Sequence, residues 1–186
     1  MAAAACLAAA PAAARAAPAR TVQEGACAAA RTVPATAASA ARSARALLCL
    51  VNRERTRSDL PPLRVNRCLE RAAAGHARDM VRRRYFAHTS PDGRAFDARI
   101  LATGYAPPPA RWTLGENLAW GGDAAWVVGA WMRSSGHRAN MLRARFREIG
   151  VAAVPGAPVP RAADAPPRAT FAATFGARSG VGRGCR

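Results

Sequence analysis

Apolar residues recur at helical spacing in two stretches in the first half of the chain. The stretch 39–57 predicts a helix that stops before the Pro61-Pro62 pair, and its short apolar stripe consists of Leu47, Leu48 and Val51. A second helix is predicted after Asn66, a residue type that caps helix N-termini well. Its buried face consists of Leu69, Ala72, Ala73, His76, Ala77 and Met80.

The second half of the chain alternates apolar and polar residues in strand fashion. Strands are predicted over 112–120, around 149–153 and around 171–175. A Pro-Asp-Gly turn at 91–93 precedes a short predicted helix over 96–103. Asp123 can cap a further helix that carries Val127, Val128 and Trp131 and ends near Gly136. Because helices and strands mix without regular βαβ alternation, the predicted fold class is α+β.

Arginine dominates the charge of the chain. There are 28 basic residues against 11 acidic ones, which gives a net charge of +17, and every basic residue is arginine. This charge favours a partner rich in phosphate or carboxylate, such as an anionic lipid or an acidic cell-envelope polymer. Nucleic acid is not expected, because the sequence has no zinc finger, basic zipper or aromatic RNA-binding motif. The alternative is that the arginines, with the excess of Ala, Gly and Pro, reflect genomic base composition.

The N-terminal segment predicts export. Residues 1–19 have the alanine-rich character and the A-x-A cleavage options of a secretory signal peptide. An Ala-rich extension over 20–45, a domain over 46–177 and a tail over 178–186 are expected to follow. No run of 18 strongly apolar residues occurs, so no transmembrane segment is predicted. We therefore expect a secreted or extracellular protein, and the sequence does not predict its oligomeric state.

Four cysteines remain after removal of this leader, and four cysteines allow three disulfide connectivities. We predict a Cys27–Cys49 bridge, which would fasten the Ala-rich extension to the first helix. Cys68 and Cys185 would form the second pair. In the alternative, Cys68 is a free, half-buried helix thiol and Cys185 is unpaired in the tail.

Four side chains are candidates for chemistry, and each has a structural alternative. His76 lies in an apolar helix face and is read as a core or boundary histidine, whereas His88 precedes a tight turn, where functional side chains are common. Glu116 alternates with leucines, so it must meet a cation, hydrogen-bond donors, a metal or a water-filled cavity, unless a bulge turns it to solvent. His137 follows Gly136, where it would stabilise a helix C-terminus.

Three segments together resemble a known family. They are FAHTSPDG (86–93), GENLAW (115–120) and WMRSSGHRANML (131–142), with supporting matches at 50–55, 60–63 and 148–151. In this order they resemble the CAP superfamily of cysteine-rich secretory, antigen 5 and pathogenesis-related proteins, in its compact bacterial SCP-like extracellular form. The resemblance implies a three-layer α-β-α sandwich. It also implies a cavity lined by His88, Glu116 and His137, with Ser134 where larger members have a second glutamate.

This cavity suggests two functions. Two imidazoles and one carboxylate, His88, His137 and Glu116, are a ligand set that suits zinc with an open fourth position. The same side chains can bind an anionic group with no cofactor. No serine or threonine has the context of a nucleophile, so the catalytic residues are not predicted. We expect a secreted, non-catalytic binding module for a lipid, cell-envelope or other anionic ligand. The alternatives are a metal-assisted hydrolase and an adhesin that uses only its arginine-rich faces.

Overall fold

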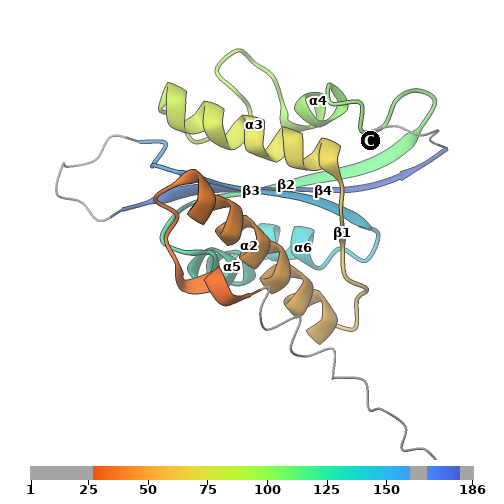
Figure 1. Ribbon diagram of the computed structural model, residues 1–186. Coiled ribbons are helices and arrows are strands. Elements are labelled where there is room, and N and C mark those ends of the chain that lie inside the picture. The colour runs from red at the N-terminus through yellow and green to blue at the C-terminus, as the bar shows by residue number, and fades with distance from the viewer. Residues whose placement is uncertain (1–26, 160–166, 181–186) are drawn as a thin grey trace, which may run out of the picture.

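The computed structural model describes residues 27–159 and 167–180, and its helices and strands are shown in Figure 1. In chain order they are the 3-10 helix η1 (Ala28–Arg31), α2 (Ala37–Arg57), β1 (Arg64–Val65), α3 (Arg67–Arg83), α4 (Phe96–Leu101), β2 (Arg111–Gly121), α5 (Ala124–Arg133), α6 (Ser135–Met141), β3 (Glu148–Pro155) and β4 (Ala169–Ser179).

A four-stranded sheet separates two layers of helices. The strand order is β1-β3-β4-β2, with β1 parallel to β3 and the other pairs antiparallel. Helices α3 and α4 cover one face, while α2, α5 and α6 cover the other (Figure 1). The α+β class and the α-β-α sandwich are therefore confirmed. Within the described ranges, no helix is long and apolar enough to cross a membrane.

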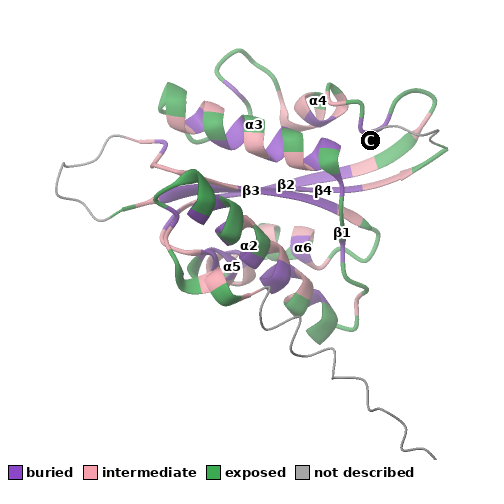
Figure 2. Cartoon of the chain, viewed as in Figure 1, coloured by how far each residue is buried: buried purple, intermediate pink, exposed green. Residues whose placement is uncertain are grey.

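The two faces of the sheet have cores of different size. Large side chains fill the space between the sheet and the layer of α2, α5 and α6, among them Trp131, Phe146, Ile149, Phe171 and Phe175. The space under α3 is filled mostly by small ones, namely Ala73, Ala77, Ala152 and Ala172, with Met80 and Leu118. The central strands are buried along most of their length (Figure 2). The predicted alternation of β4 is confirmed, because Phe171, Ala173 and Phe175 all contribute to the larger core.

Helix α3 lies unusually close to the sheet at Gly150. A β-carbon added at Gly150 would meet the carbonyl carbon of Leu69 at 2.0 Å and the amide nitrogen of Glu70 at 2.1 Å. The hydroxyl of Thr174 also donates to the carbonyl of Leu69 at 2.9 Å. A glycine on β3 is therefore required for the helix to reach this depth.

Several predicted helix boundaries are confirmed and three differ from the structure. Asn66 caps α3 and Asp123 caps α5, as expected. Helix α2 begins at Ala37, two residues before the predicted start at 39, because Thr36 and Ser39 form a capping box. The fifth helix ends at Arg133 rather than near Gly136, because Ser134 is extended and α6 starts at once.

The predicted short helix over 96–103 ends earlier, at Leu101. Strand β1 has only two residues and was not predicted, because its pairing with β3 defines it and its sequence carries no alternation.

The Cys27–Cys49 disulfide is confirmed and joins the segment before η1 to the middle of α2. The hydroxyl of Ser43 supports the same contact by donating to the carbonyl of Thr32. Cys68 is fully buried and disulfide-bonded, which contradicts the free-thiol alternative. Its predicted partner, Cys185, lies outside the described residues, and so do the predicted leader and most of the tail.

A fully buried arginine fixes the end of α2 against the segment that leads into β3. The guanidinium of Arg55 donates to four backbone carbonyls, those of Pro61, Met141, Arg143 and Phe146. Burial, and then the charge of Arg147, lower its pKa from the usual value. Asn52 holds Leu63 nearby through both its amide oxygen and its amide nitrogen. Arg55 and Asn52 lie in the matched segment 50–55, and Pro61 and Leu63 lie in the matched segment 60–63.

Substituting Gly150 by alanine tests the close approach of α3. We expect Gly150→Ala to lower the free energy of unfolding by about 3 kcal/mol, because the helix backbone must move away from β3. Gly75→Ala, on the same helix with open space around it, is the control and is expected to stabilise the fold by up to about 1 kcal/mol. Urea denaturation measures both, and equal midpoints for the two variants would contradict the requirement.

Glu148 joins β3, β4 and the start of α3. Its carboxylate accepts hydrogen bonds from Tyr105 at 2.7 Å, Asn66 at 2.9 Å and Arg178 at 3.2 Å. Burial raises the pKa of Glu148, but these hydrogen bonds and the charge of Arg178 outweigh burial, so the pKa lies below the usual value.

The lowered pKa predicts acid sensitivity. A carboxylate whose pKa is lower in the folded chain stabilises the fold above its unfolded pKa, and the stabilisation is lost as the pH falls through the folded pKa. Between about pH 5 and pH 3, we expect the free energy of unfolding to fall more steeply for the wild type than for Glu148→Gln. Urea denaturation over this pH range measures both slopes, and identical slopes would show that Glu148 does not contribute.

Candidate functional site

Glu116 lies in the middle of β2, opposite Thr174, and its side chain is only 2 % exposed. Its neighbours at two-residue spacing, Leu114 and Leu118, pack with residues of α3 and α4. The pairing of β2 with β4 is continuous through this position, so no bulge turns Glu116 to solvent. The prediction that Glu116 shares a face with these leucines is confirmed.

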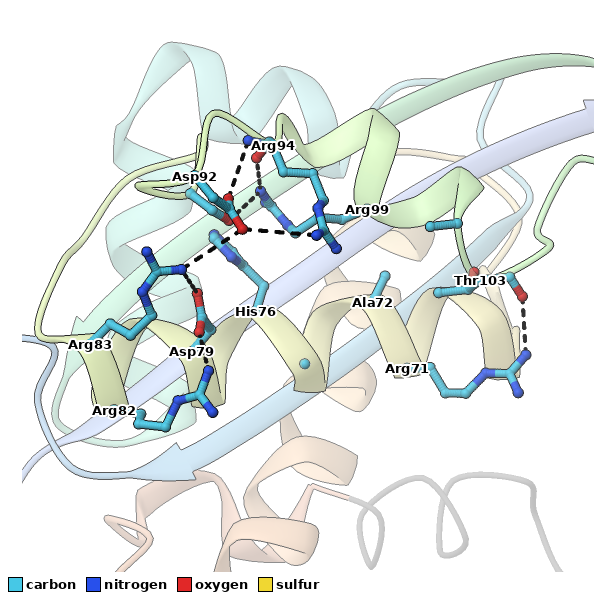
Figure 3. A pocket seen from close by; sticks show the side chains of 13 residues that line it. Arg71, Ala72, His76, Asp79, Arg82, Arg83, Asp92, Arg94, Arg99 and Thr103 are labelled. Atoms are coloured by element: carbon cyan, nitrogen blue, oxygen red, sulfur yellow. Dashed lines mark hydrogen bonds and ion pairs between the residues drawn. The ribbon is translucent and has the colours of Figure 1, made fainter.

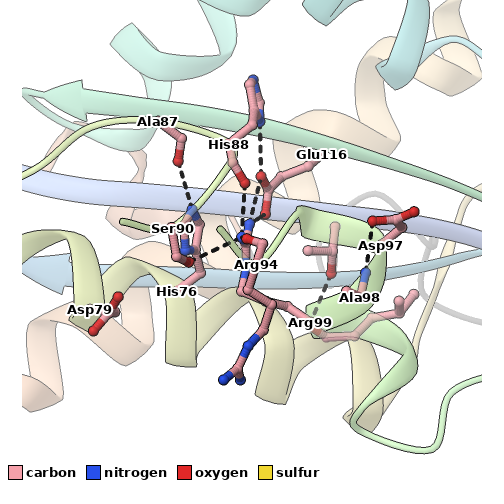
Figure 4. A network of polar contacts seen from close by, with 12 residues as sticks. His76, Asp79, Ala87, His88, Ser90, Arg94, Asp97, Ala98, Arg99 and Glu116 are labelled. Carbon is pink, nitrogen blue, oxygen red and sulfur yellow. Dashed lines mark hydrogen bonds and ion pairs between the residues drawn. The ribbon is translucent and has the colours of Figure 1, made fainter. Parts of the chain in front are cut away.

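Arg99 of α4 supplies the cation that a buried carboxylate requires. Its Nη2 atom donates to both carboxylate oxygens of Glu116, at 3.1 and 3.0 Å. Its Nη1 atom donates to the carbonyls of His88 and Arg94, each at 2.8 Å, and approaches the hydroxyl of Ser90 at 3.3 Å (Figure 4). One side chain therefore neutralises Glu116 and fixes the loop that carries His88.

His88 lies at the surface on the other side of the carboxylate. Its Nδ1 atom is 2.8 Å from Oε1 of Glu116, and its side chain is 51 % exposed. Since carboxylate oxygens accept hydrogen bonds, Glu116 is the acceptor of this bond and Nδ1 is its donor. The Nε2 atom stays outside the pair, so it is the ring nitrogen that an incoming ligand meets.

His137 lies on α6, in the layer on the opposite face of the sheet. Its Nδ1 atom is 2.9 Å from the hydroxyl of Ser134, and its ring stacks on Trp131. Burial lowers the pKa of His137, and the nearby charge of His88 lowers it further. The expectation that His137 follows the end of a helix is wrong, because Gly136 and His137 both lie inside α6.

Two asparagines connect α6 to the strand that carries Glu116. The amide of Asn117 donates to the carbonyl of His137 at 2.9 Å, and the amide of Asn140 donates to Asn117 at 3.0 Å and to the carbonyl of Glu116 at 3.2 Å. A β-carbon at Gly115 would come within 2.9 Å of Asn140. The small residue before Glu116 therefore makes room for the amide that holds α6 in place.

His76 has the structural role that the sequence indicates. It is 2 % exposed, and its Nε2 atom donates to the carbonyl of Ala87 at 2.9 Å. Burial is the largest influence on its pKa and lowers it. His76 therefore supports the His88 loop from below without reaching the surface around His88.

The donor set fits a three-ligand zinc site poorly. Both oxygens of Glu116 already accept hydrogen bonds from Arg99, and Oε1 also accepts from His88, so three of its four lone pairs are used and only one, on Oε2, remains for a metal. A cation beside it would also be repelled by the guanidinium of Arg99. Among the residues that the structure describes, no three His, Cys, Asp or Glu side chains are grouped as a metal site.

Arg99, Asn117 and Asn140 are site residues that sequence reasoning missed. The sequence indicated that Glu116 needs a partner, but 28 arginines gave no way to choose among them. The asparagines lie within the matched segments at 115–120 and 131–142, and this location was the one signal in the sequence that could have indicated a role in the site.

Removing Arg99 would leave a buried, unpaired carboxylate. We expect Arg99→Met to lower the free energy of unfolding by about 3–5 kcal/mol, and an added Glu116→Gln substitution to restore part of the loss. Arg94→Met, at an exposed position in the loop between His88 and α4, is expected to lower the free energy of unfolding by less than about 1 kcal/mol. A thermal or urea denaturation series checks all three variants. Equal losses from Arg99→Met and Arg94→Met would exclude this role of the ion pair.

Known proteins are similar to this chain in sequence and in fold. The chain is 39 % identical over 105 residues to the uncharacterized protein YkwD of Bacillus subtilis (strain 168), and the match covers 55 % of this chain but only 38 % of YkwD. An extracellular protein containing an SCP domain from Bacillus anthracis is similar in structure, with a TM-score of 0.61, 25 % identity and coverage of 77 % of this chain and 44 % of that chain.

An outer surface protein of Borrelia burgdorferi shares the fold, with a TM-score of 0.62 and 22 % identity over 74 % of this chain and 93 % of that chain. The sequence model described as "CAP: Cysteine-rich secretory protein family" matches residues 48–161, which is more than half of the chain. The match includes the loop of His88, the strand of Glu116 and the helix of His137. The chain therefore belongs to the cysteine-rich secretory protein (CAP) family.

Proposed function

We propose that this chain is a secreted binding module that captures an anionic ligand at the surface around His88, Glu116 and His137, without catalysing a reaction. The observation that carries the proposal is the set of hydrogen bonds at Glu116. Its two oxygens accept three hydrogen bonds from Arg99 and His88, and the guanidinium of Arg99 lies against both oxygens, which disfavours a role as a general base or a metal ligand. It serves instead to orient the exposed imidazole of His88.

Two observations support export. The Cys27–Cys49 disulfide is typical of proteins that fold in an oxidising compartment. The relatives described by name include an extracellular protein and an outer surface protein. Both agree with the leader expected over 1–19.

The charge of the chain supports an anionic ligand. A net charge of +17 attracts lipid head groups and acidic cell-envelope polymers over distances of about one Debye length. At close range, the Nε2 edge of a protonated His88 can donate to an anionic oxygen. Phe86, which is 41 % exposed two residues before His88, offers an apolar contact to a ligand that also carries a chain.

Anionic vesicles test this function. We expect the purified chain to sediment with phosphatidylglycerol vesicles but not with phosphatidylcholine vesicles at about 0.15 M salt. His88→Ala should weaken this binding about tenfold, because it removes a charge-assisted hydrogen bond. Arg67→Gln is the control for general electrostatics, because it removes an exposed charge elsewhere and should change affinity little.

Two results would contradict the proposal. If Arg67→Gln and His88→Ala weaken binding equally, the chain is an electrostatic adhesin rather than a module with a site. A catalytic turnover that His88→Ala abolishes would show that the protein is an enzyme.

A metal-assisted hydrolase is the second candidate. The observation that favours it is the hydrogen bond from His88 Nδ1 to Glu116, since a carboxylate often orients a metal-binding histidine in this way. Calorimetric titration of zinc into the wild type and into His88→Ala/His137→Ala separates the two functions. Micromolar binding lost in the double variant would favour the hydrolase, whereas equal or absent binding in both would favour the binding module.

A further inference from the structure

A second site lies on the far side of the His88 loop, in a groove between α3 and the segment 90–103. The groove has a volume of about 450 Å³, which lies within the range of small-molecule sites. Arginines line both walls, with Arg71, Arg82 and Arg83 on the α3 side and Arg94 and Arg99 opposite (Figure 3). Neither His88 nor His137 lines it.

The groove carries an excess of positive charge. Two aspartates line it, and Asp79 is already paired with Arg82 at 2.7 Å and accepts a hydrogen bond from Tyr85 at 2.7 Å. Arg99 is committed to Glu116. Four arginines therefore face two aspartates, and the excess favours a ligand with more than one negative charge.

Arg83 and Arg94 are the arginines best placed to bind a ligand. They approach Asp92 from opposite walls, but only at 3.9 and 3.8 Å, which is longer than a hydrogen bond. Arg83 also makes one long hydrogen bond, of 3.4 Å from its Nη1 atom to Asp79, which leaves its other N–H groups outside this contact. Most of their N–H groups therefore remain available to a ligand between them. A phosphate can accept from guanidinium groups on two sides, because it presents several acceptor oxygens and a high charge.

The shape of the groove favours an extended ligand. Arg71 and Arg83 are twelve residues apart on α3, which corresponds to about 18 Å along the helix axis. Between them the floor is low, because it consists of Ala72, Gly75 and the buried His76. At Gly75 a β-carbon would meet no atom within 4 Å. A linear chain can lie along this floor, with charged groups at each end.

We propose that this groove binds a linear chain of phosphate groups, laid along α3 between the two arginine walls. This site is separate from the surface around His88, so neither proposal depends on the other. Arg99 contacts both regions, through Glu116 on one side and the groove on the other.

The test uses inorganic polyphosphate and two charge-matched double variants of the purified chain. At about 0.15 M salt we expect saturable binding that Arg83→Gln/Arg94→Gln weakens at least about tenfold. Arg67→Gln/Arg78→Gln removes the same charge from exposed positions of α3 outside the groove and should change affinity less than about threefold. Equal weakening by the two double variants, or no saturable binding by the wild type, would overturn the proposal.

A steric variant locates the ligand. Gly75→Leu places a side chain into the open floor, and it should preserve or raise the melting temperature because leucine is the better helix former. We expect it to weaken polyphosphate binding as much as the arginine variant does, whereas His88→Ala should leave this binding unchanged. Unchanged affinity in Gly75→Leu would place the ligand elsewhere. Equal affinity for poly-aspartate would show that the groove recognises carboxylate polymers, and this would also overturn the assignment to phosphate chains.

Discussion

The pairing of Arg99 with Glu116 is the interaction on which the candidate site depends. A carboxylate that is 2 % exposed in the middle of a strand is tolerated only when a cation and hydrogen-bond donors reach it. Arg99 meets this need and also holds the carbonyls of His88 and Arg94, so the position of the loop follows from the need to neutralise Glu116. The exposed imidazole of His88 is thereby held by buried groups rather than by its own loop, as a preorganised binding group requires.

The depth of α3 against the sheet sets the second constraint. Gly150 lets the helix backbone reach β3, and the hydroxyl of Thr174 fixes the carbonyl of Leu69 at that depth. The thin core of alanines under α3 matches this short distance. Helix α3 forms one wall of the arginine groove. The small residues beneath it, Gly150 and the alanines, therefore set the position of the arginines on that wall.

The arginines of this chain serve different purposes, although the sequence shows them as one class. Arg55 is fully buried and donates to backbone carbonyls, so it acts as a structural link. Arg99 neutralises a carboxylate, while Arg83 and Arg94 line a groove and contact its aspartates only at 3.4 Å or more. The net charge of +17 therefore does not by itself show which arginines stabilise the fold and which line a site.

The sequence by itself determined the local structure and the candidate residues. Periodicity and caps predicted α3 and strands β2, β3 and β4, and the matched segments indicated His88, Glu116 and His137, because these features depend on residues near one another in the chain. It also showed that Glu116 required a partner. Only the tertiary structure decided that this partner is Arg99, that α6 starts at Ser135, and that arginines of α3 and of the segment 90–103 share a groove. These outcomes depend on contacts between distant segments, for which one arginine in the sequence is equivalent to another.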